Sequence, residues 1–241
     1  MKISELFYSI QGEGKRIGVP SFFIRTNNCN LRCMFSGGNL CDTPYTSWTP
    51  EDKHNIGEIS IDDIINEYKN SGAEEVVITG GEPTLQYEEL ADLCSKLKDA
   101  GAYITLETNG TRDGRFLDYI DLISVSPKLK SSTPFDTKHE KMHLQNRINL
   151  AVLKAYHDIS IKENKDIQWK FVYCNVKDIK EILMLQQKIG FTNKDIYLMP
   201  EGLTDIDISS KRIELAEVCK KYHFNYTDRL QIQIWGSKRG V

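Results

Sequence analysis

Three cysteines within one short segment are the residues of this chain best suited to chemistry. Cys29, Cys33 and Cys41 fall in the stretch CNLRCMFSGGNLC, directly after an apolar run over 21–26. Three thiolates on a loop at a strand end suit a soft metal or an iron–sulfur cluster. A structural zinc site normally takes four ligands, so three fit a cluster that leaves one metal position open. Three reduced cysteines without a metal are the alternative, because spacing alone does not decide between the two.

Length and composition indicate an ordinary globular protein. The 241 residues suffice for one sizeable core, and 27% charged residues with a net charge of −3 give no basic nucleic-acid surface. No apolar run reaches the roughly 18 residues needed to span a bilayer, and the N-terminus lacks the apolar core of a signal peptide. We therefore expect a cytoplasmic protein with reduced cysteines, of which Cys94, Cys174 and Cys219 belong to the core.

The elements that must position the cysteine loop alternate between strands and helices. Strands are predicted over 21–26, 76–79, 103–107, 122–126, 168–173 and 196–199. Apolar residues at helical spacing lie between them, for example over 146–162 and 176–189, and the tail over 229–241 is predicted as a final strand. Such alternation predicts an α/β fold with a mostly parallel sheet, as an open barrel or a doubly wound sheet. Ligands of these folds bind at the carboxyl ends of the strands.

Each unusual motif of the chain follows one of these strands. After the cysteine loop these motifs are GGEP at 80–83, ETNG at 107–110, SPK at 126–128 and MPEG at 199–202. Near the start, SIQGEG offers the side chains of Gln11 and Glu13 beside two glycines, as a ligand loop or as a simple turn. Arg25 interrupts an apolar strand, so it pairs within the core or meets a carboxylate of a ligand. Because each of these motifs follows a strand, we expect them to form one composite site.

These motifs together resemble the radical S-adenosylmethionine superfamily, and within it the family that makes 7-carboxy-7-deazaguanine. The resemblance includes SIQGEG, Arg25, the CDT that closes the cysteine loop and WGSKRGV at 235–241. It implies a partial (β/α)6 barrel of the radical SAM type, in one domain over 1–241.

The cysteine spacing departs from the superfamily pattern. Most members have Cx3CxxC, whereas this chain has Cx3Cx7C, with Ser36 where the third cysteine usually falls. We interpret 36–40 as an insertion and Cys41 as the ligand, because Asp42 and Thr43 follow it as they follow the usual third cysteine. If Ser36 were the equivalent residue, only two cysteine ligands would remain.

The resemblance also implies three cofactors: a [4Fe–4S] cluster, S-adenosylmethionine and Mg²⁺. Cys29, Cys33 and Cys41 would hold the cluster, and Thr43 would bind magnesium. Electron transfer from the cluster would cleave the sulfonium to a 5′-deoxyadenosyl radical, and Glu82 would pair with the amino group of the cofactor's methionine. The residues implied to bind the cofactor are Gly80, Gly81, Glu82, Thr108, Ser126, Pro127, Lys128, Met199, Pro200, Glu201 and Gly202.

The activity implied is that of a lyase in queuosine and deazapurine biosynthesis. Its substrate would be 6-carboxy-5,6,7,8-tetrahydropterin, whose ring contracts with loss of ammonia. Arg25 would hold the substrate carboxylate, and Glu13 would accept from ring N–H groups, while no residue acts catalytically beyond the cluster and cofactor. A homodimer and a flavodoxin or ferredoxin as electron donor are implied too. The residues implied to bind substrate are Ile10, Gln11, Gly12, Glu13, Arg25, Thr79 and Val241.

Other functions compete with this one. HEKMH at 139–143 matches the HExxH pattern of zinc hydrolases, with Glu140 as base and Glu163 as a third ligand, although two histidines on a solvated helix face explain it adequately. A glycyl-radical activating enzyme would keep the cluster and change the substrate. A non-enzymatic metal-binding module would leave the strand-end motifs unexplained. The polar excursion over 128–145 has no assigned role.

Overall fold

A nine-stranded sheet forms the frame of the protein. The computed structural model describes the backbone of all 241 residues and every side chain except those of Ser36 and Arg115. Across the sheet the strand order is β3-β1-β2-β4-β5-β6-β7-β8-β9. The strands are β1 (Lys2–Ile10), β2 (Pro20–Thr26), β3 (Gly57–Glu58), β4 (Glu75–Gly80), β5 (Tyr103–Thr108), β6 (Leu122–Val125), β7 (Asp166–Tyr173), β8 (Ile196–Pro200) and β9 (Asn225–Tyr226).

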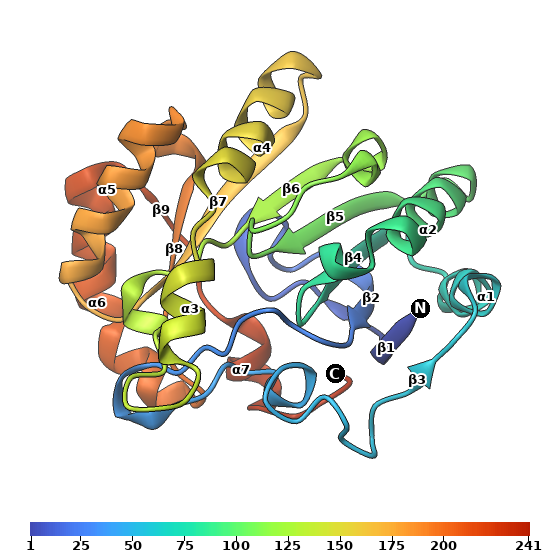
Figure 1. Ribbon diagram of the computed structural model, residues 1–241, viewed down its shortest axis with the longest axis horizontal. Coiled ribbons are helices and arrows are strands. Elements are labelled where there is room, and N and C mark those ends of the chain that lie inside the picture. The colour runs from blue at the N-terminus through green and yellow to red at the C-terminus, as the bar shows by residue number, and fades with distance from the viewer.

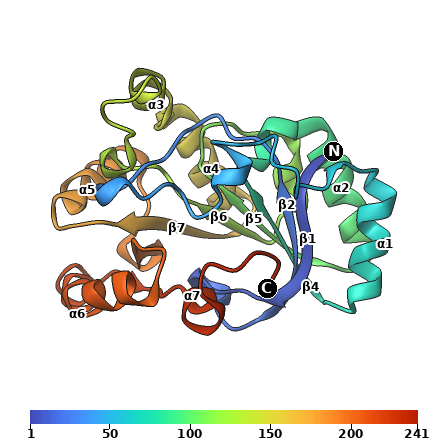
Figure 2. The same ribbon diagram turned by 90° about the horizontal axis from the view of Figure 1, so that it is seen from below.

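The sheet is mostly parallel and open. β1 runs antiparallel to both neighbours, and every pairing from β2 to β9 is parallel. Within the described backbone, β3 and β9 are the two edges, so the curved sheet does not close. Helices surround its outer face (Figures 1 and 2). This architecture confirms the predicted α/β fold and partial barrel, with nine strands where seven, including the tail, were predicted.

Seven α-helices accompany the strands, and local sequence explains several of their ends. Ser60 caps α1 by accepting from the N–H of Asp63, and Gly72, at φ 68°, ends it. Thr204 and Asp207 form a capping box at the start of α6. The helices are α1 (Ile61–Ser71), α2 (Tyr87–Asp99), α3 (Glu140–Asn146), α4 (Leu150–Lys162), α5 (Lys177–Ile189), α6 (Asp205–Tyr222) and α7 (Leu230–Trp235).

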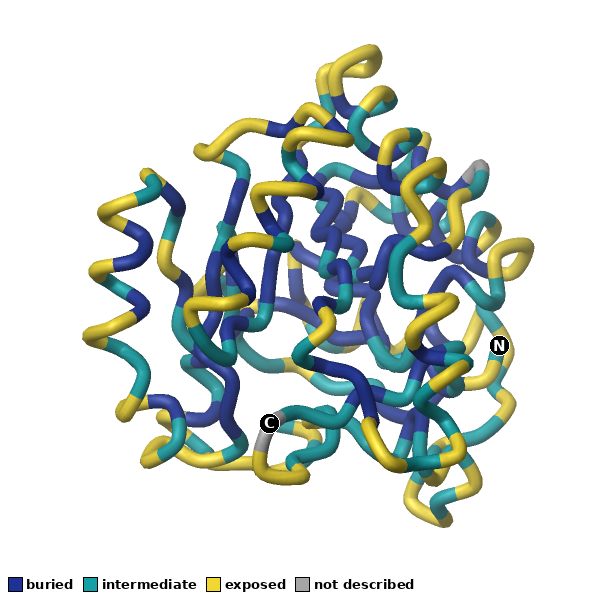
Figure 3. Tube along the Cα trace, turned by 60° about the vertical axis from the view of Figure 1, so that its left-hand side comes forward, coloured by how far each residue is buried: buried dark blue, intermediate teal, exposed yellow. Residues whose placement is uncertain are grey.

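The core lies between the sheet and these helices. Figure 3 shows the burial concentrated in the strands and along one side of each helix. Trp169 on β7 is fully buried and stacks on Phe191 with ring centroids 4.4 Å apart. Cys94 and Cys219 are buried as predicted, while Cys174 is half-buried. Among the described residues, no helix combines the length and apolar character needed to cross a membrane.

The strand predicted over 229–241 is wrong. Leu230–Trp235 form the short helix α7, and Gly236, at φ 68°, ends it. The alternation of apolar residues suggested a strand, yet Ile232 is buried while Ile234 is 49% exposed, so the two do not share a buried sheet face. After α7 the chain continues without regular structure to Val241.

The helix predicted over 146–162 is confirmed as α4, which begins four residues later than predicted, and a separate short helix, α3, precedes it. α3 ends at Asn146, and α4 begins at Leu150. Asn149 separates them because its side chain accepts a hydrogen bond from the N–H of Val152 and thereby caps α4. The short α3 carries part of the HEKMH motif and lies beside the cysteine loop.

Candidate active site

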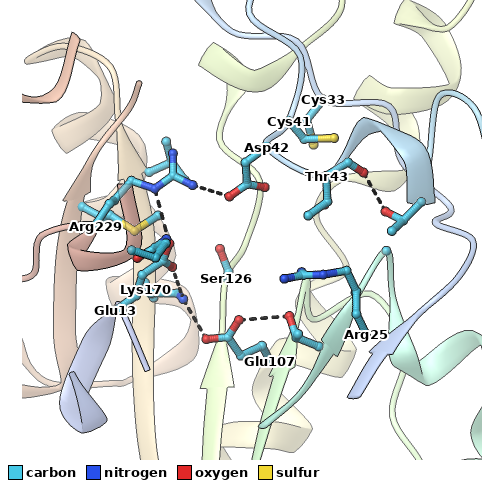
Figure 4. Close-up of a pocket in the computed structure, with 18 of the residues that line it drawn as sticks. Glu13, Arg25, Cys33, Cys41, Asp42, Thr43, Glu107, Ser126, Lys170 and Arg229 are labelled. Atoms are coloured by element: carbon cyan, nitrogen blue, oxygen red, sulfur yellow. Dashed lines mark hydrogen bonds and ion pairs between the residues drawn. The ribbon is translucent and has the colours of Figure 1, made fainter. Parts of the chain in front are cut away.

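A cavity opens at the carboxyl ends of the parallel strands, where the unusual motifs meet. Figure 4 shows its walls, with Glu13, Lys170 and Arg229 on one side and Arg25 on the other. Most of the residues expected to bind a cluster, cofactor or substrate line this cavity. They are Ile10, Gln11, Gly12, Glu13, Arg25, Cys29, Cys33, Cys41, Thr43, Thr79, Gly80, Gly81, Thr108, Ser126, Lys128, Met199, Glu201, Gly202 and Val241.

Glu82, Pro127 and Pro200 lie outside this described lining, and all three are buried. The Glu82 carboxylate accepts hydrogen bonds from Thr84, from the Thr108 hydroxyl (2.7 Å) and from the N–H of Asn109 (2.7 Å). Burial raises its pKa despite these bonds, because the bonded groups are all neutral. Glu82 thus ties the loops after β4 and β5 together. Its contact with a cofactor ammonium stays a prediction, and such a charge would suit a buried carboxylate.

The three cysteines line the same cavity and lie near enough for their thiols to interact electrostatically. Burial raises the pKa of each thiol, that of Cys29 to about 12; neighbouring thiols raise the pKa of Cys29 and Cys33 further and Asp42 raises that of Cys41, whereas Lys128 lowers all three. A cationic group between them would reverse this repulsion and favour the thiolates. Among the described residues, no group of three metal-binding side chains is close enough to hold a single ion. Cysteine thiolates are the ligands of iron–sulfur clusters, so the chemistry of this donor set suits a cluster.

The insertion at 36–40 leaves Cys41 beside Cys33. Met34 and Leu40 pair as an antiparallel bridge that closes the inserted segment, and the N–H of Cys41 donates to the carbonyl of Cys33 (3.2 Å). The extra residues therefore loop outward without separating the two cysteines, which supports Cys41 as a ligand. The Ser36 side chain, the alternative, lies outside the described part of the chain.

The two glycines after β4 are required by backbone packing. A Cβ on Gly80 would lie 2.3 Å from the carbonyl oxygen of Thr26, and one on Gly81 would lie 2.1 Å from that of Asn28. Backbone bonds join the same segments, with Gly81 N–H donating to Thr26 (3.1 Å). The glycines thus press the loop after β4 against the start of the cysteine loop. The structure thus gives these glycines a packing role, and their close approach to the cofactor stays a prediction.

Glu13 lies at the centre of one ion-pair network on the cavity wall. Its carboxylate contacts Lys170 (2.6 Å), Arg229 (3.3 Å) and the Gln231 amide (2.8 Å). Lys170 also contacts Glu107 at 2.9 Å. Burial opposes ionisation of Glu13, but Lys170 and Arg229 outweigh it and lower its pKa to about 2.

Other members of this network connect the predicted substrate residues. Glu107 accepts from the Thr79 hydroxyl (3.1 Å) and the Gln11 amide (3.4 Å), and Arg229 pairs with Asp42 in the cysteine loop. Lys170, Arg229 and Glu107 were not predicted. Lys170 could have been found by the signal that identified Arg25, since it is a cation inside the apolar run QWKFVY.

Arg25 belongs to a second network on the opposite wall. It pairs with Glu5 through Nε at 2.8 Å, and Figure 4 shows its guanidinium end directed into the cavity. Glu5 also accepts from the Tyr45 hydroxyl (2.7 Å) and pairs with Arg239 (2.8 Å). Arg25 therefore has a partner within the protein, as one alternative predicted, and it also faces the cavity, while its contact with a carboxylate of a ligand stays a prediction.

Comparison with known proteins identifies the family. The sequence model of the Radical SAM superfamily matches residues 23–211. 7-Carboxy-7-deazaguanine synthase of Halobacterium salinarum is 40% identical, in an alignment that covers 98% of this chain and 90% of that protein. This chain belongs to the 7-carboxy-7-deazaguanine synthase family of radical SAM enzymes. The synthase of Rhodopirellula baltica is 37% identical over 99% of this chain and 88% of its own.

A solved structure agrees with the fold. The crystal structure of QueE from Escherichia coli superposes with a TM-score of 0.62 at 24% identity, covering 95% of this chain and 93% of its own. Membership in the family confirms the predicted radical SAM lyase of deazapurine biosynthesis, and with it a [4Fe–4S] cluster and S-adenosylmethionine. It also favours this activity over a glycyl-radical activating enzyme.

The HEKMH motif forms no zinc site among the described residues. His143 is fully buried, with Nε2 3.2 Å from the Ser132 hydroxyl, whereas His139 packs edge-on against Trp48. Glu163 pairs with its neighbour Lys162 at the end of α4. The prediction of two histidines on a solvated face is therefore wrong for His143, because α3 turns it toward the segment beside the cysteine loop.

Proposed function

We propose that this chain converts 6-carboxy-5,6,7,8-tetrahydropterin into 7-carboxy-7-deazaguanine with loss of ammonia. The observation that supports it is a cavity that joins three cysteine thiols to walls of opposite charge. One wall carries three carboxylates (Glu13, Glu107, Asp42) against two cations (Lys170, Arg229), and the other presents Arg25. The substrate has the matching polarity, with a carboxylate at one end and N–H donors at the other.

Arg25 binds the substrate carboxylate in this proposal. Its bond to Glu5 uses Nε, so both terminal nitrogens remain directed into the cavity. Two parallel N–H groups match the two oxygens of a carboxylate, which fixes orientation as well as charge. The arginine thereby sets where the carboxylate-bearing carbon lies.

Glu13 and Glu107 read the opposite edge of the heterocycle. A carboxylate offers roughly four acceptor positions. Three of those on Glu13 meet Lys170, Arg229 and Gln231, which leaves Oε2 able to accept from a ring N–H. Glu107 accepts from the Gln11 amide and the Thr79 hydroxyl, and so orients two side chains that line the cavity. The lowered pKa of Glu13 keeps it an acceptor at neutral pH.

The cofactor residues lie between these walls. When bound, the cluster and S-adenosylmethionine supply the electron and the radical that begin the rearrangement. Cys29, Cys33 and Cys41 would hold the cluster. Lys128 donates to the Ser126 hydroxyl (2.9 Å), and its charge favours the nearby thiolates. The same ammonium can meet the carboxylate of the cofactor's methionine.

Several finer features belong to the proposal as well. Thr43 would contribute an oxygen to Mg²⁺, an ion that prefers oxygen ligands and keeps several waters. We propose one domain over 1–241, with 36–40 as an insertion and 128–145 as an excursion, that acts as a cytoplasmic homodimer. A flavodoxin or ferredoxin would supply the electron. Among these features, Mg²⁺ and the homodimer are suggested by the resemblance to the family.

Product formation tests the proposal directly. The protein is reconstituted anaerobically with iron and sulfide and incubated with S-adenosylmethionine, reductant, Mg²⁺ and carboxytetrahydropterin. We expect 7-carboxy-7-deazaguanine by mass spectrometry, with product and bound iron lost in Cys41→Ala and retained in Ser36→Ala. Formation of 5′-deoxyadenosine without this product would refute the substrate. Retention of the cluster in Cys41→Ala would refute the assignment of the third ligand.

A further inference from the structure

Glu5 is a buried carboxylate shared by three segments that are distant in the sequence. It lies on β1, Arg25 on β2, Tyr45 after the cysteine loop, and Arg239 in the segment after α7. The side chain of Glu5 is 10% exposed, against 31% for Arg239. Arg25 lines the cavity, whereas Glu5, Tyr45 and Arg239 are outside its described lining. Glu5, Tyr45 and Arg239 can therefore affect a ligand only through Arg25.

The two oxygens of Glu5 are divided between its partners. Oε2 accepts from Arg25 Nε (2.8 Å) and from the Tyr45 hydroxyl (2.7 Å), while Oε1 accepts from Arg239 Nε (2.8 Å). Arg239 is itself held in position, because its guanidinium lies 3.6 Å from the Tyr45 ring centroid and donates to Asn55 at 3.1 Å. Glu5 and Arg25 are direct cross-strand partners, so they must meet whatever Arg239 does.

In a second arginine–glutamate pair of the same chain, one arginine binds both carboxylate oxygens. Arg16 meets both oxygens of Glu75, donating from Nε (3.1 Å) to one and from Nη2 to the other. It also lies over a tyrosine ring, that of Tyr103, at 5.0 Å. Its side chain is 35% exposed and that of Glu75 is 11% exposed, values close to those of Arg239 and Glu5. A carboxylate that pairs with a single arginine thus accepts two parallel hydrogen bonds from it, which is the preferred geometry of an arginine–carboxylate pair.

We propose that Arg239 and Glu5 are positioning residues that keep Arg25 available to the substrate carboxylate. Arg239 occupies one oxygen of Glu5, so Arg25 is bound through Nε alone and its terminal nitrogens remain in the cavity. Without Arg239, Glu5 takes Arg25 in the two-point fork of Arg16 and Glu75, which withdraws one terminal nitrogen from the ligand. This inference rests on the proposed function, because it assigns a role to the arginine that would hold the substrate.

Substrate binding by Arg239→Gln tests the inference. Reconstituted protein with S-adenosylmethionine is titrated anaerobically by calorimetry with carboxytetrahydropterin, and separately with tetrahydropterin, which lacks the carboxylate. Loss of one of two charged hydrogen bonds predicts about a tenfold weaker Kd and higher KM for the carboxylated ligand. We expect kcat within about threefold and unchanged binding of tetrahydropterin, since the lost bond holds the substrate and the transition state equally. Arg239→Lys should restore part of the affinity.

Matched variants separate positioning from structural damage. Arg16→Gln removes the comparable arginine, whose partner Glu75 begins β4, and should leave both affinities unchanged. Glu5→Gln keeps the side-chain shape but has one acceptor oxygen and cannot hold Arg25 in the fork, so Arg239→Gln should weaken binding less in a Glu5→Gln background than in the wild type. Equal weakening of both ligands, or unchanged binding in Arg239→Gln, would overturn the inference. A wild-type protein that binds no carboxytetrahydropterin would instead defeat the proposed function, and the inference with it.

Discussion

Two networks, each centred on a carboxylate, flank the cavity. Both place a glutamate between two cations, but they present different side chains to a ligand. Glu13 lies between Lys170 and Arg229, and Glu5 lies between two arginines. Around Glu13 both cations line the cavity, and each is shared with a further carboxylate. Around Glu5 only Arg25 lines the cavity.

This difference teaches how one pocket can present opposite polarities. Lys170 and Arg229 each pair with two carboxylates, so their charges are neutralised within the protein. The wall around Glu13 therefore offers hydrogen-bond acceptors to the donor groups of a ligand. Arg25 shares its only buried carboxylate partner with Arg239, so its wall retains positive character. A ligand with a carboxylate at one end and N–H groups at the other is therefore oriented by charge before any contact is optimised.

The largest expected effect is on stability, from Lys170→Met. Lys170 is 5% exposed and is the cation that Glu13 and Glu107 share. Removing one partner of a buried pair leaves an uncompensated charge and costs roughly 3–5 kcal/mol. We expect the free energy of unfolding of the apo-protein, measured in urea, to fall by about that amount. Arg239→Gln, at a more exposed pair, should cost about 1 kcal/mol or less. Equal losses in the two variants would show that the networks do not differ energetically.

The next effect is on substrate binding, from Arg25→Gln. Both charged hydrogen bonds to the substrate carboxylate are lost, which predicts a Kd weaker by about 100- to 200-fold at roughly 1.5 kcal/mol for each bond. Calorimetry with tetrahydropterin provides the control, because this ligand has no carboxylate and should bind as it does to the wild type. If both ligands weaken alike, Arg25 supports the wall of the cavity and does not bind the carboxylate.

Much of the fold followed from sequence periodicity, and the exceptions have physical causes. Apolar runs such as 76–79 and 103–107 are buried on both sides in a parallel sheet, so their composition alone identifies them. α7 was mistaken for a strand because Ile232 and Ile234 alternate, although only one of them is buried. No local pattern distinguishes a short helix from a strand at such a site.

The candidate site was predicted where its residues lie in glycine-rich motifs at strand ends. Its ion-pair partners were missed because they are joined only by the fold. Glu13 meets Lys170 across 157 residues and Arg229 across 216. Glu5 belongs to an ordinary alternating strand, and nothing in its neighbours indicates two arginines. A buried cation in an apolar strand was the one local signal, used for Arg25 and overlooked for Lys170.

The smallest expected effect is the pH dependence that Glu13 gives to stability. Its pKa is about 2 in the folded protein against an ordinary 4.5, so the unfolded chain takes up the proton first on acidification. Its contribution to stability is complete above pH 4.5 and is lost as the pH falls toward 2. Between pH 4.5 and 3 the advantage of wild-type apo-protein over Glu13→Gln should shrink by roughly 1–2 kcal/mol in urea unfolding. Parallel curves over this range would mean that Lys170 and Arg229 do not hold Glu13 ionised, and would remove the contrast between the two walls.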